Sequence, residues 1–186
     1  MRINEINRAT DKFDLGYVDT FYNNLFMPIR ESVTNVLEIG IQYGESLLLW
    51  RDYFPNAEIY GVDIQTWNPS LSQEERLKLF YTDAYTTEFT STLNNEFFDI
   101  IIDDGPHTFD SMVFFLRHYI SKLKPGGILV LEDIINKSWT HQLINVINTN
   151  YTNYITIFDM RNRIPDPVLN ETWQHGLDVI VLQKRV

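Results

Sequence analysis

The sequence contains no cysteine, which excludes a disulfide scaffold, a thiolate metal site and a cysteine nucleophile. It also lacks any apolar run that approaches the roughly 20 residues of a membrane-spanning helix, so no membrane partner is expected. The first 20 residues have no apolar core of the kind that signal peptides carry. We therefore expect a cytoplasmic protein.

Basic residues are few compared with acidic ones. The chain has 15 Lys and Arg against 25 Asp and Glu, a formal net charge of −10. A surface of this sign repels phosphate backbones, so the composition argues against a nucleic-acid partner. The 44% of apolar residues argues against disorder. A chain of 186 residues has the length of one domain, and we assign residues 1–186 to a single domain.

Seven short runs rich in Val, Ile, Leu and Phe predict buried strands. They cover residues 33–39, 58–62, 77–81, 98–102, 127–131, 154–158 and 177–182. Segments with helical spacing lie between them, the clearest from Phe109 to Leu123, with Thr108 or Asp110 as its cap and a stop at 122–126. This alternation indicates a Rossmann-like, doubly wound α/β fold with a mostly parallel sheet. Ligands in such folds bind at the carboxyl ends of the strands.

Two segments stand apart from this alternation. Residues 1–32 precede the first strand and contain an aromatic-rich helix candidate at 17–29, which we expect to form a helical lid over the ligand crevice. Residues 161–176 are expected to form a long loop before the last strand. The Rossmann-like core then spans residues 33–186.

The turn after the first strand has the spacing G-x-x-x-G, with Gly40 and Gly44. It lacks the middle glycine that admits a pyrophosphate in dinucleotide folds, which disfavours a nicotinamide-dependent oxidoreductase. Asp63 ends the second strand about 20 residues later, where a carboxylate can accept hydrogen bonds from ribose hydroxyls. Asp83, after the third strand, can reach an adenine amine or cap a helix. A nucleoside cofactor fits this pattern, although a simple tight turn is an equal alternative for the glycines alone.

Acidic residues cluster at the ends of the fourth and fifth strands. Asp103 and Asp104 are adjacent after a buried run, and Glu132 and Asp133 follow the next strand. Clustered carboxylates repel one another unless a cation lies between them, and oxygen ligands suit Mg²⁺ or Mn²⁺ rather than Zn²⁺. We expect Asp104, Glu132 and Asp133 to hold such a cation, the alternative being a solvated acidic rim.

A histidine, His107, lies three residues after Asp104. An imidazole, whose ordinary pKa is about 6.5, can accept a proton at neutral pH. We therefore expect His107 to be a general base. The alternative is a residue that only begins a helix.

Four stretches together resemble class I S-adenosylmethionine-dependent methyltransferases: VLEIGIQYGESLLLW, YFPNAEIYGVDI, FDIIIDDGPHTFD and LKPGGILVLEDI. More narrowly, they are similar to the metal-dependent sugar O-methyltransferases of the macrocin and mycinamicin type and the related cephalosporin-hydroxylase-like group. The resemblance covers about residues 11–133. It implies a seven-stranded sheet whose last strand is antiparallel.

The resemblance also implies roles for individual residues. His107 and Asp104 would be catalytic, and Asp104, Glu132 and Asp133 would hold Mg²⁺ or Mn²⁺. The cofactor S-adenosylmethionine would be bound by Tyr17, Glu38, Gly40, Tyr43, Gly44, Asp63, Ile64, Asp83 and Asp103. The leader DKFDLGY, which supplies Tyr17, is similar to the family's DKG-x-x-HGY but lacks its histidine, and Pro106 replaces the usual serine of DDGSH.

The expected function is therefore Mg²⁺-dependent O-methylation of a hydroxyl on a sugar, a glycosylated natural product or another small molecule. Two alternatives stay open. One is a catechol-type metal-dependent O-methyltransferase that acts on a phenolic diol, and the other is a non-catalytic S-adenosylmethionine-binding subunit. A homo-oligomer is compatible with the sequence.

Overall fold

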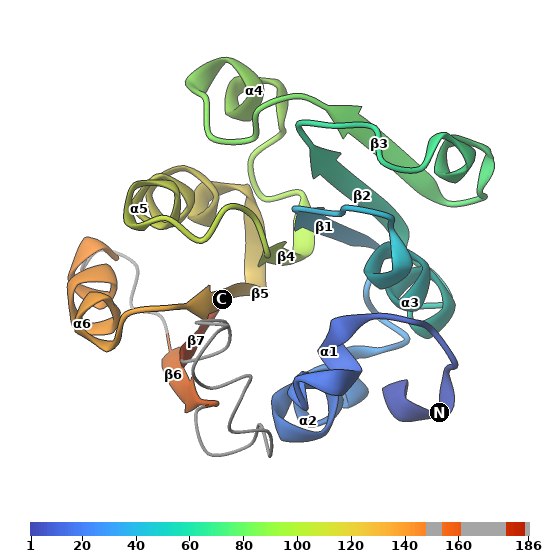
Figure 1. Cartoon of the computed structure of the whole chain (residues 1–186), viewed down its shortest axis with the longest axis horizontal. Coiled ribbons are helices and arrows are strands. Elements are labelled where there is room, and N and C mark those ends of the chain that lie inside the picture. Colours follow the sequence, from blue (N-terminus) through green and yellow to red (C-terminus); the bar gives the residue numbers. More distant parts are fainter. Residues whose placement is uncertain (148–153, 161–177, 185–186) are drawn as a thin grey trace.

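The computed structural model describes residues 1–147, 154–160 and 178–184, and its centre is one seven-stranded sheet (Figure 1). The strands are β1 (Asn35–Ile39), β2 (Glu58–Asp63), β3 (Leu77–Tyr81), β4 (Phe98–Asp103), β5 (Leu123–Ile134), β6 (Tyr154–Asp159) and β7 (Asp178–Gln183). Their order is β3-β2-β1-β4-β5-β7-β6. The pairs among β1 to β5 are parallel, and β7 is antiparallel to β5 and β6. The predicted doubly wound sheet with an antiparallel last strand is confirmed.

Strand β5 differs most from its prediction. It extends from Leu123 to Ile134, whereas the sequence predicts a strand at 127–131 with the acids after its end. Its pairing with β7 is irregular between Leu131 and Ile134, and Asp133 has a left-handed backbone with φ 52°. Glu132 and Asp133 therefore lie on an irregularity within the strand, because pairing with β7 continues beyond the apolar run.

Smaller differences occur at other boundaries. Strand β1 begins at Asn35 because the N–H of Val33 still bonds to the carbonyl of Ile29 in the preceding turn. The predicted helix to Leu123 ends at His118, followed by the short helix η5 (Ile120–Lys122), and Leu123 already belongs to β5. The loop predicted at 161–176 and the first residue of the seventh predicted strand lie outside the described residues.

Helices cover both faces of the sheet (Figure 1). Alternate residues of β4 face opposite sides, so Ile100 and Ile102 join one hydrophobic cluster while Ile101 joins the other. The first cluster contains α3 (Glu45–Tyr53) and the N-terminal segment. The second contains α4 (Thr87–Thr92), α5 (Phe109–His118) and α6 (Lys137–Val146). Thr108 is the N-cap of α5, where its side chain accepts a bond from the N–H of Ser111.

The N-terminal segment, residues 1–32, is a packed layer rather than one regular helix. It contains η1 (Ile3–Glu5), α1 (Asp11–Asp14), η2 (Val18–Tyr22), α2 (Asn23–Phe26) and η3 (Met27–Ile29). The predicted helix at 17–29 is thus a series of short helical turns. Phe21, Tyr22 and Phe26 are buried, and the rings of Tyr22 and Phe26 contact Trp50 of α3. Their burial fixes the segment on one face of the sheet.

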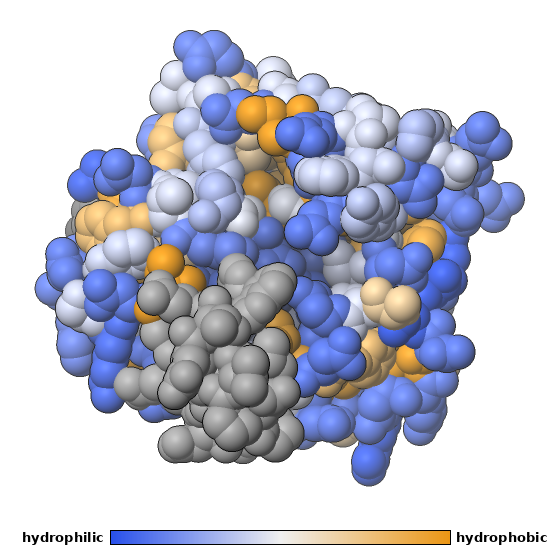
Figure 2. All heavy atoms as spheres, in the orientation of Figure 1, coloured by the Kyte–Doolittle hydropathy of each residue, from blue (hydrophilic) through white to orange (hydrophobic). Residues whose placement is uncertain are grey.

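Hydrophilic side chains predominate on the face drawn in Figure 2, where apolar side chains form small separate groups. Within the described ranges, none of the helices combines the length and the hydropathy that crossing a bilayer requires.

Candidate active site

Two adjoining cavities open at the carboxyl ends of β1 and β4, where the strand order reverses. The larger, of about 610 Å³, is lined by residues that include Asp63, Ile64, Asp83, Tyr85 and Phe114. The smaller, of about 510 Å³, is lined by residues that include Asp11, Tyr43, Glu45, His107 and Asp133. Both are lined by Gly40, Gln42, Asp104 and Gly105. Both volumes are typical of small-molecule sites.

The turn between β1 and α3 brings the backbone of β1 against that of β4. Gly40 and Gly44 have left-handed backbones, with φ 83° and 85°. A Cβ at Gly40 would lie 2.0 Å from the carbonyl oxygen of Asp104. The Asp104 N–H in turn donates to the Ile39 carbonyl at 2.9 Å. Only glycine at position 40 therefore permits this approach.

Replacing Gly40 by alanine is expected to lower the free energy of unfolding by about 3 kcal/mol or more, because left-handed strain is added to a backbone clash. Gly16→Ala is the matched control, since Gly16 also has a positive φ, 72°, but has open space around it. The control should lose only about 1 kcal/mol. Chemical denaturation of both variants measures the difference, and equal losses would refute the close approach.

Asp63, at the end of β2, holds the glycine turn in place. Its Oδ2 accepts hydrogen bonds from the N–H groups of Ile41 and Gln42, at 3.1 and 3.0 Å. Its Oδ1 accepts from Gln65 N–H at 2.9 Å and from the indole N–H of Trp67 at 3.3 Å. Asp63 therefore forms part of the wall of the larger cavity and fixes the turn beside it.

Two other predicted cofactor residues, Ile64 and Asp83, line the larger cavity, and a third, Asp103, bonds to Tyr85 of its wall. Asp83 accepts a hydrogen bond from Tyr85 N–H at 2.8 Å, while Thr86 caps α4, so the capping alternative for Asp83 is wrong. Tyr85 donates its hydroxyl to Asp103. Burial raises the pKa of Asp103 to about 7, although the bond from Tyr85 opposes this. Ile64 is 71% exposed at the rim.

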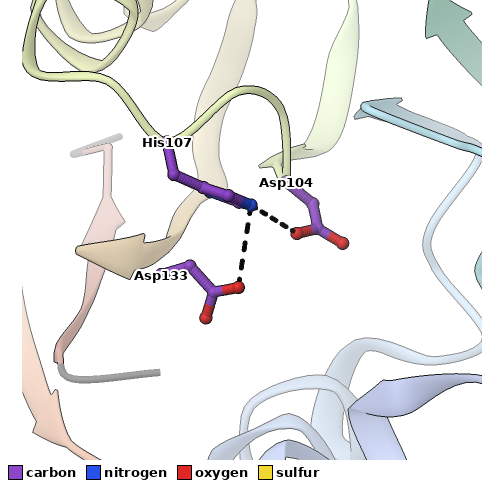
Figure 3. Close-up of side chains that lie close together, drawn as sticks. All are labelled: Asp104, His107 and Asp133. Carbon is purple, nitrogen blue, oxygen red and sulfur yellow. Dashed lines mark ion pairs between the residues drawn. The ribbon is translucent and has the colours of Figure 1, made fainter. Parts of the chain in front are cut away.

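Asp104, His107 and Asp133 come together at the smaller cavity (Figure 3). His107 Nε2 lies 3.7 Å from Asp104 Oδ1 and 3.7 Å from Asp133 Oδ2. One atom of each of the three side chains lies within 4.8 Å of the others, which is compact enough for a shared ion. His107 and Asp133 both have φ 52°, a left-handed backbone that is uncommon outside glycine and concentrated at functional sites.

The third predicted metal ligand, Glu132, bonds to the ammonium group of Lys12. Both of its oxygens bond to Nζ of Lys12, at 3.0 and 2.9 Å, and it also accepts the hydroxyl of Tyr22. Burial raises the pKa of Glu132 to about 7, Lys12 lowers it, and Asp133 raises it further. Burial likewise raises the pKa of Asp104 well above its usual range, against the effect of Lys12.

Lys12 is the residue that sequence reasoning missed. It is buried in α1 and its Nζ bonds to Asp104 Oδ2 at 2.9 Å as well as to Glu132. Although burial by itself lowers the pKa of Lys12, the carboxylates of Asp104, Glu132 and Glu38 raise it well above its ordinary value. The only signal available was its place in the leader DKFDLGY.

Two predicted cofactor residues, Glu38 and Tyr17, are not among the residues that line the two cavities. Glu38 is fully buried, and its Oε2 accepts the hydroxyl of Ser46 at 2.7 Å. Tyr17 is 1% exposed and donates its hydroxyl to Asp133. Tyr17 thus contacts one acid of the smaller cavity directly, and Glu38 Oε1 lies 3.4 Å from Nζ of Lys12.

The donors at the smaller cavity are carboxylate oxygens and one imidazole nitrogen. This set suits Mg²⁺ or Mn²⁺, which prefer oxygen ligands. The larger cavity is lined by Gly40 of the glycine turn, by the carboxylate of Asp63 at the end of β2, and by apolar side chains. These features suit a nucleoside without a pyrophosphate.

The chain matches the family model described as a methyltransferase domain over residues 37–134. It is 31% identical over 140 residues to the mycinamicin VI 2''-O-methyltransferase of Micromonospora griseorubida, covering 70% of this chain and 35% of that protein. It is 29% identical over 150 residues to the demethylmacrocin O-methyltransferase of Streptomyces fradiae, covering 73% of this chain and 38% of that protein. The chain thus spans about a third of the length of these relatives.

A solved structure of the MycE methyltransferase in complex with Mg, SAH and mycinamycin VI has a similar fold. The TM-score is 0.60 with 23% identity, over 88% of this chain and 47% of that one. At this identity the likeness supports the fold alone.

Proposed function

The chain belongs to the methyltransferase domain family, and on that premise we propose that it transfers the methyl group of S-adenosylmethionine to a hydroxyl of a sugar or glycosylated natural product, with Mg²⁺ or Mn²⁺. The observation that carries the proposal is the group of Asp104, His107 and Asp133 at a cavity that shares a wall with a second, nucleoside-sized one. The named activities of the two relatives, both O-methyltransferases, support it.

The larger cavity is the proposed cofactor site. Asp63 would accept the ribose hydroxyls there, Asp83 would reach the adenine, and Ile64 would cover its ring. S-Adenosylmethionine supplies an electrophilic methyl group when bound. Gly40 would lie beside the end of the cofactor that bears this group, because Gly40 lines both cavities.

The smaller cavity is the proposed acceptor site. His107 would accept the proton of the reacting hydroxyl, which is a poor nucleophile at neutral pH. Asp104 and Asp133 would hold the divalent ion beside it, whereas Glu132, the third acid expected from the sequence, bonds to Lys12. The ion supplies Lewis acidity, which lowers the pKa of a neighbouring hydroxyl. The walls orient the acceptor in line with the methyl group.

Asp63→Asn is expected to weaken the binding of S-adenosylhomocysteine by about 10- to 100-fold, because a charged hydrogen-bond acceptor is lost. Asp99→Asn is the matched control. Asp99 also accepts two backbone N–H groups, of Thr34 and Asn35, but it lies at the start of β4. Calorimetric titration of both variants checks this, and equal affinities would contradict the role of Asp63.

Labelled S-adenosylmethionine tests the whole proposal. The protein should transfer the label to a glycosylated acceptor with vicinal hydroxyls, drawn from a panel that also contains catechols. Label on catechols alone would favour the phenolic alternative. Binding of NAD without binding of S-adenosylhomocysteine would refute the cofactor assignment. The cytoplasmic location and any homo-oligomer stay predictions.

A further inference from the structure

The ammonium group of Lys12 contacts the carboxylate cluster, which comprises Glu38, Asp104, Glu132 and Asp133. Its Nζ lies 2.9 Å from Asp104 Oδ2, 3.0 and 2.9 Å from the two oxygens of Glu132, and 3.4 Å from Glu38 Oε1. The side chain is 1% exposed. An ammonium group has three N–H donors, so the oxygens of Asp104 and Glu132 occupy all of them. Among the described residues, Glu38 Oε1 has no hydrogen-bond partner, and its contact with Lys12 is electrostatic.

The three carboxylates around Lys12 come from three adjacent strands. Glu38 lies on β1, Asp104 follows β4, and Glu132 lies on β5. Burying a lysine is costly unless its charge is compensated by carboxylates. Contact with three of them places the ammonium where the strands meet, at the edge that carries the cavities.

Lys12 divides the cluster into two sides. Asp104 turns Oδ2 to Lys12 and Oδ1 to His107. Both oxygens of Glu132 bond to Lys12, and Oε1 also accepts the hydroxyl of Tyr22. Asp133 turns Oδ2 to His107. The cluster contains four carboxylates, of Glu38, Asp104, Glu132 and Asp133, and one ammonium, so its formal charge is negative and compatible with a further cation.

We infer that Lys12 is the resident cation of this cluster: it engages Glu38, Glu132 and one oxygen of Asp104, and it thereby restricts a divalent ion to the side formed by Asp104, Asp133 and His107. Lys12 is thus a positioning residue, supplied by the N-terminal segment. The inference rests on the proposed function, because it concerns the same acids.

The test is the affinity for Mn²⁺ alone, measured from the electron paramagnetic resonance signal of free Mn²⁺. Lys12→Met removes the ammonium from a buried cluster of acids, so Mn²⁺ should bind at least about tenfold more tightly. Lys124→Met is the control for net charge. Lys124 pairs with Asp99 at 2.9 Å, at the starts of β4 and β5, and its loss should change the affinity by less than about twofold.

An unchanged or weaker affinity in Lys12→Met would overturn the inference and reduce Lys12 to an anchor of the N-terminal segment. Binding of Mn²⁺ by Lys12→Met but not by the natural chain would mean that Lys12 excludes the ion instead of restricting it to one side, which would overturn the inference and refute the divalent ion of the proposed function. Absence of binding by both would overturn both. Titration of the same samples with S-adenosylhomocysteine tests the cofactor assignment separately.

A second measurement covers the case in which Lys12→Met does not fold. In the chain that retains Lys12, Glu132→Gln should weaken the Mn²⁺ affinity less than Asp133→Asn does, because Glu132 bonds to Lys12 and not to the ion. Asp133→Asn should weaken it by at least about tenfold, as expected for loss of a ligand. Equal losses in the two variants would overturn the inference.

Discussion

His107→Ala is expected to lower kcat by about 10²- to 10⁴-fold while the affinity for S-adenosylhomocysteine stays nearly unchanged. This is the range for loss of a general base. His107 lines the smaller cavity, between Asp104 and Asp133. It is not among the residues that line the larger cavity. The substitution should therefore slow the chemical step without weakening cofactor binding.

His141→Ala is the control for this experiment. His141 is exposed on α6 and should change kcat by less than about twofold, as for most surface substitutions. A collapse of cofactor affinity with kcat preserved would refute the base assignment for His107. A loss of Mn²⁺ affinity of tenfold or more, about the effect of removing a ligand or its supporting partner, would instead make His107 a ligand of the ion.

Removal of divalent ions is expected to lower turnover at least about 100-fold, because the Lewis acid contributes several kcal/mol to the transition state. An excess of EDTA should produce this loss, and excess Mg²⁺ should restore the activity. The physical reason is the donor set, in which Asp104 and Asp133 present oxygens within 4.8 Å of one another. Full turnover in EDTA would contradict the metal-dependent mechanism.

Two controls separate chemistry from folding in this experiment. Binding of S-adenosylhomocysteine should persist in EDTA, because Asp63 and Asp83, the acids proposed to contact the cofactor in the larger cavity, are not among those proposed to hold the ion. Asp133→Asn should raise the Mg²⁺ concentration for half-maximal turnover by at least about tenfold. Asp99→Asn, at the start of β4, should leave that concentration unchanged.

The sequence predicts the sheet well because each strand carries its own local signal. Apolar runs bounded by turn residues identify all seven strands, and the rule for parallel sheets brings the ends of β1 and β4 together. Gly40, Asp104 and His107 line one cavity at this edge of the sheet. The irregularity at Glu132 and Asp133 escapes prediction, because it depends on pairing between β5 and β7 rather than on the apolar run.

The sequence does not predict contacts between residues that are far apart in the chain. Lys12 is 92 residues from Asp104 and 120 from Glu132, and no local pattern relates them. Glu38 is another example. Alternate residues of a strand face opposite sides, so Glu38 shares its face with Val36 and points toward the N-terminal segment. In the sequence, Lys12 lies in a polar leader and is indistinguishable from a surface lysine. Only the packing of the N-terminal segment against the sheet shows that it is buried.

The most direct test of the proposed site is a crystal structure obtained with S-adenosylhomocysteine and Mn²⁺. The expected result is adenosine density in the larger cavity beside Asp63, with the anomalous peak of Mn²⁺ between Asp104 and Asp133. Nucleoside density elsewhere, or a Mn²⁺ peak remote from these two carboxylates, would contradict the proposed methyltransferase site.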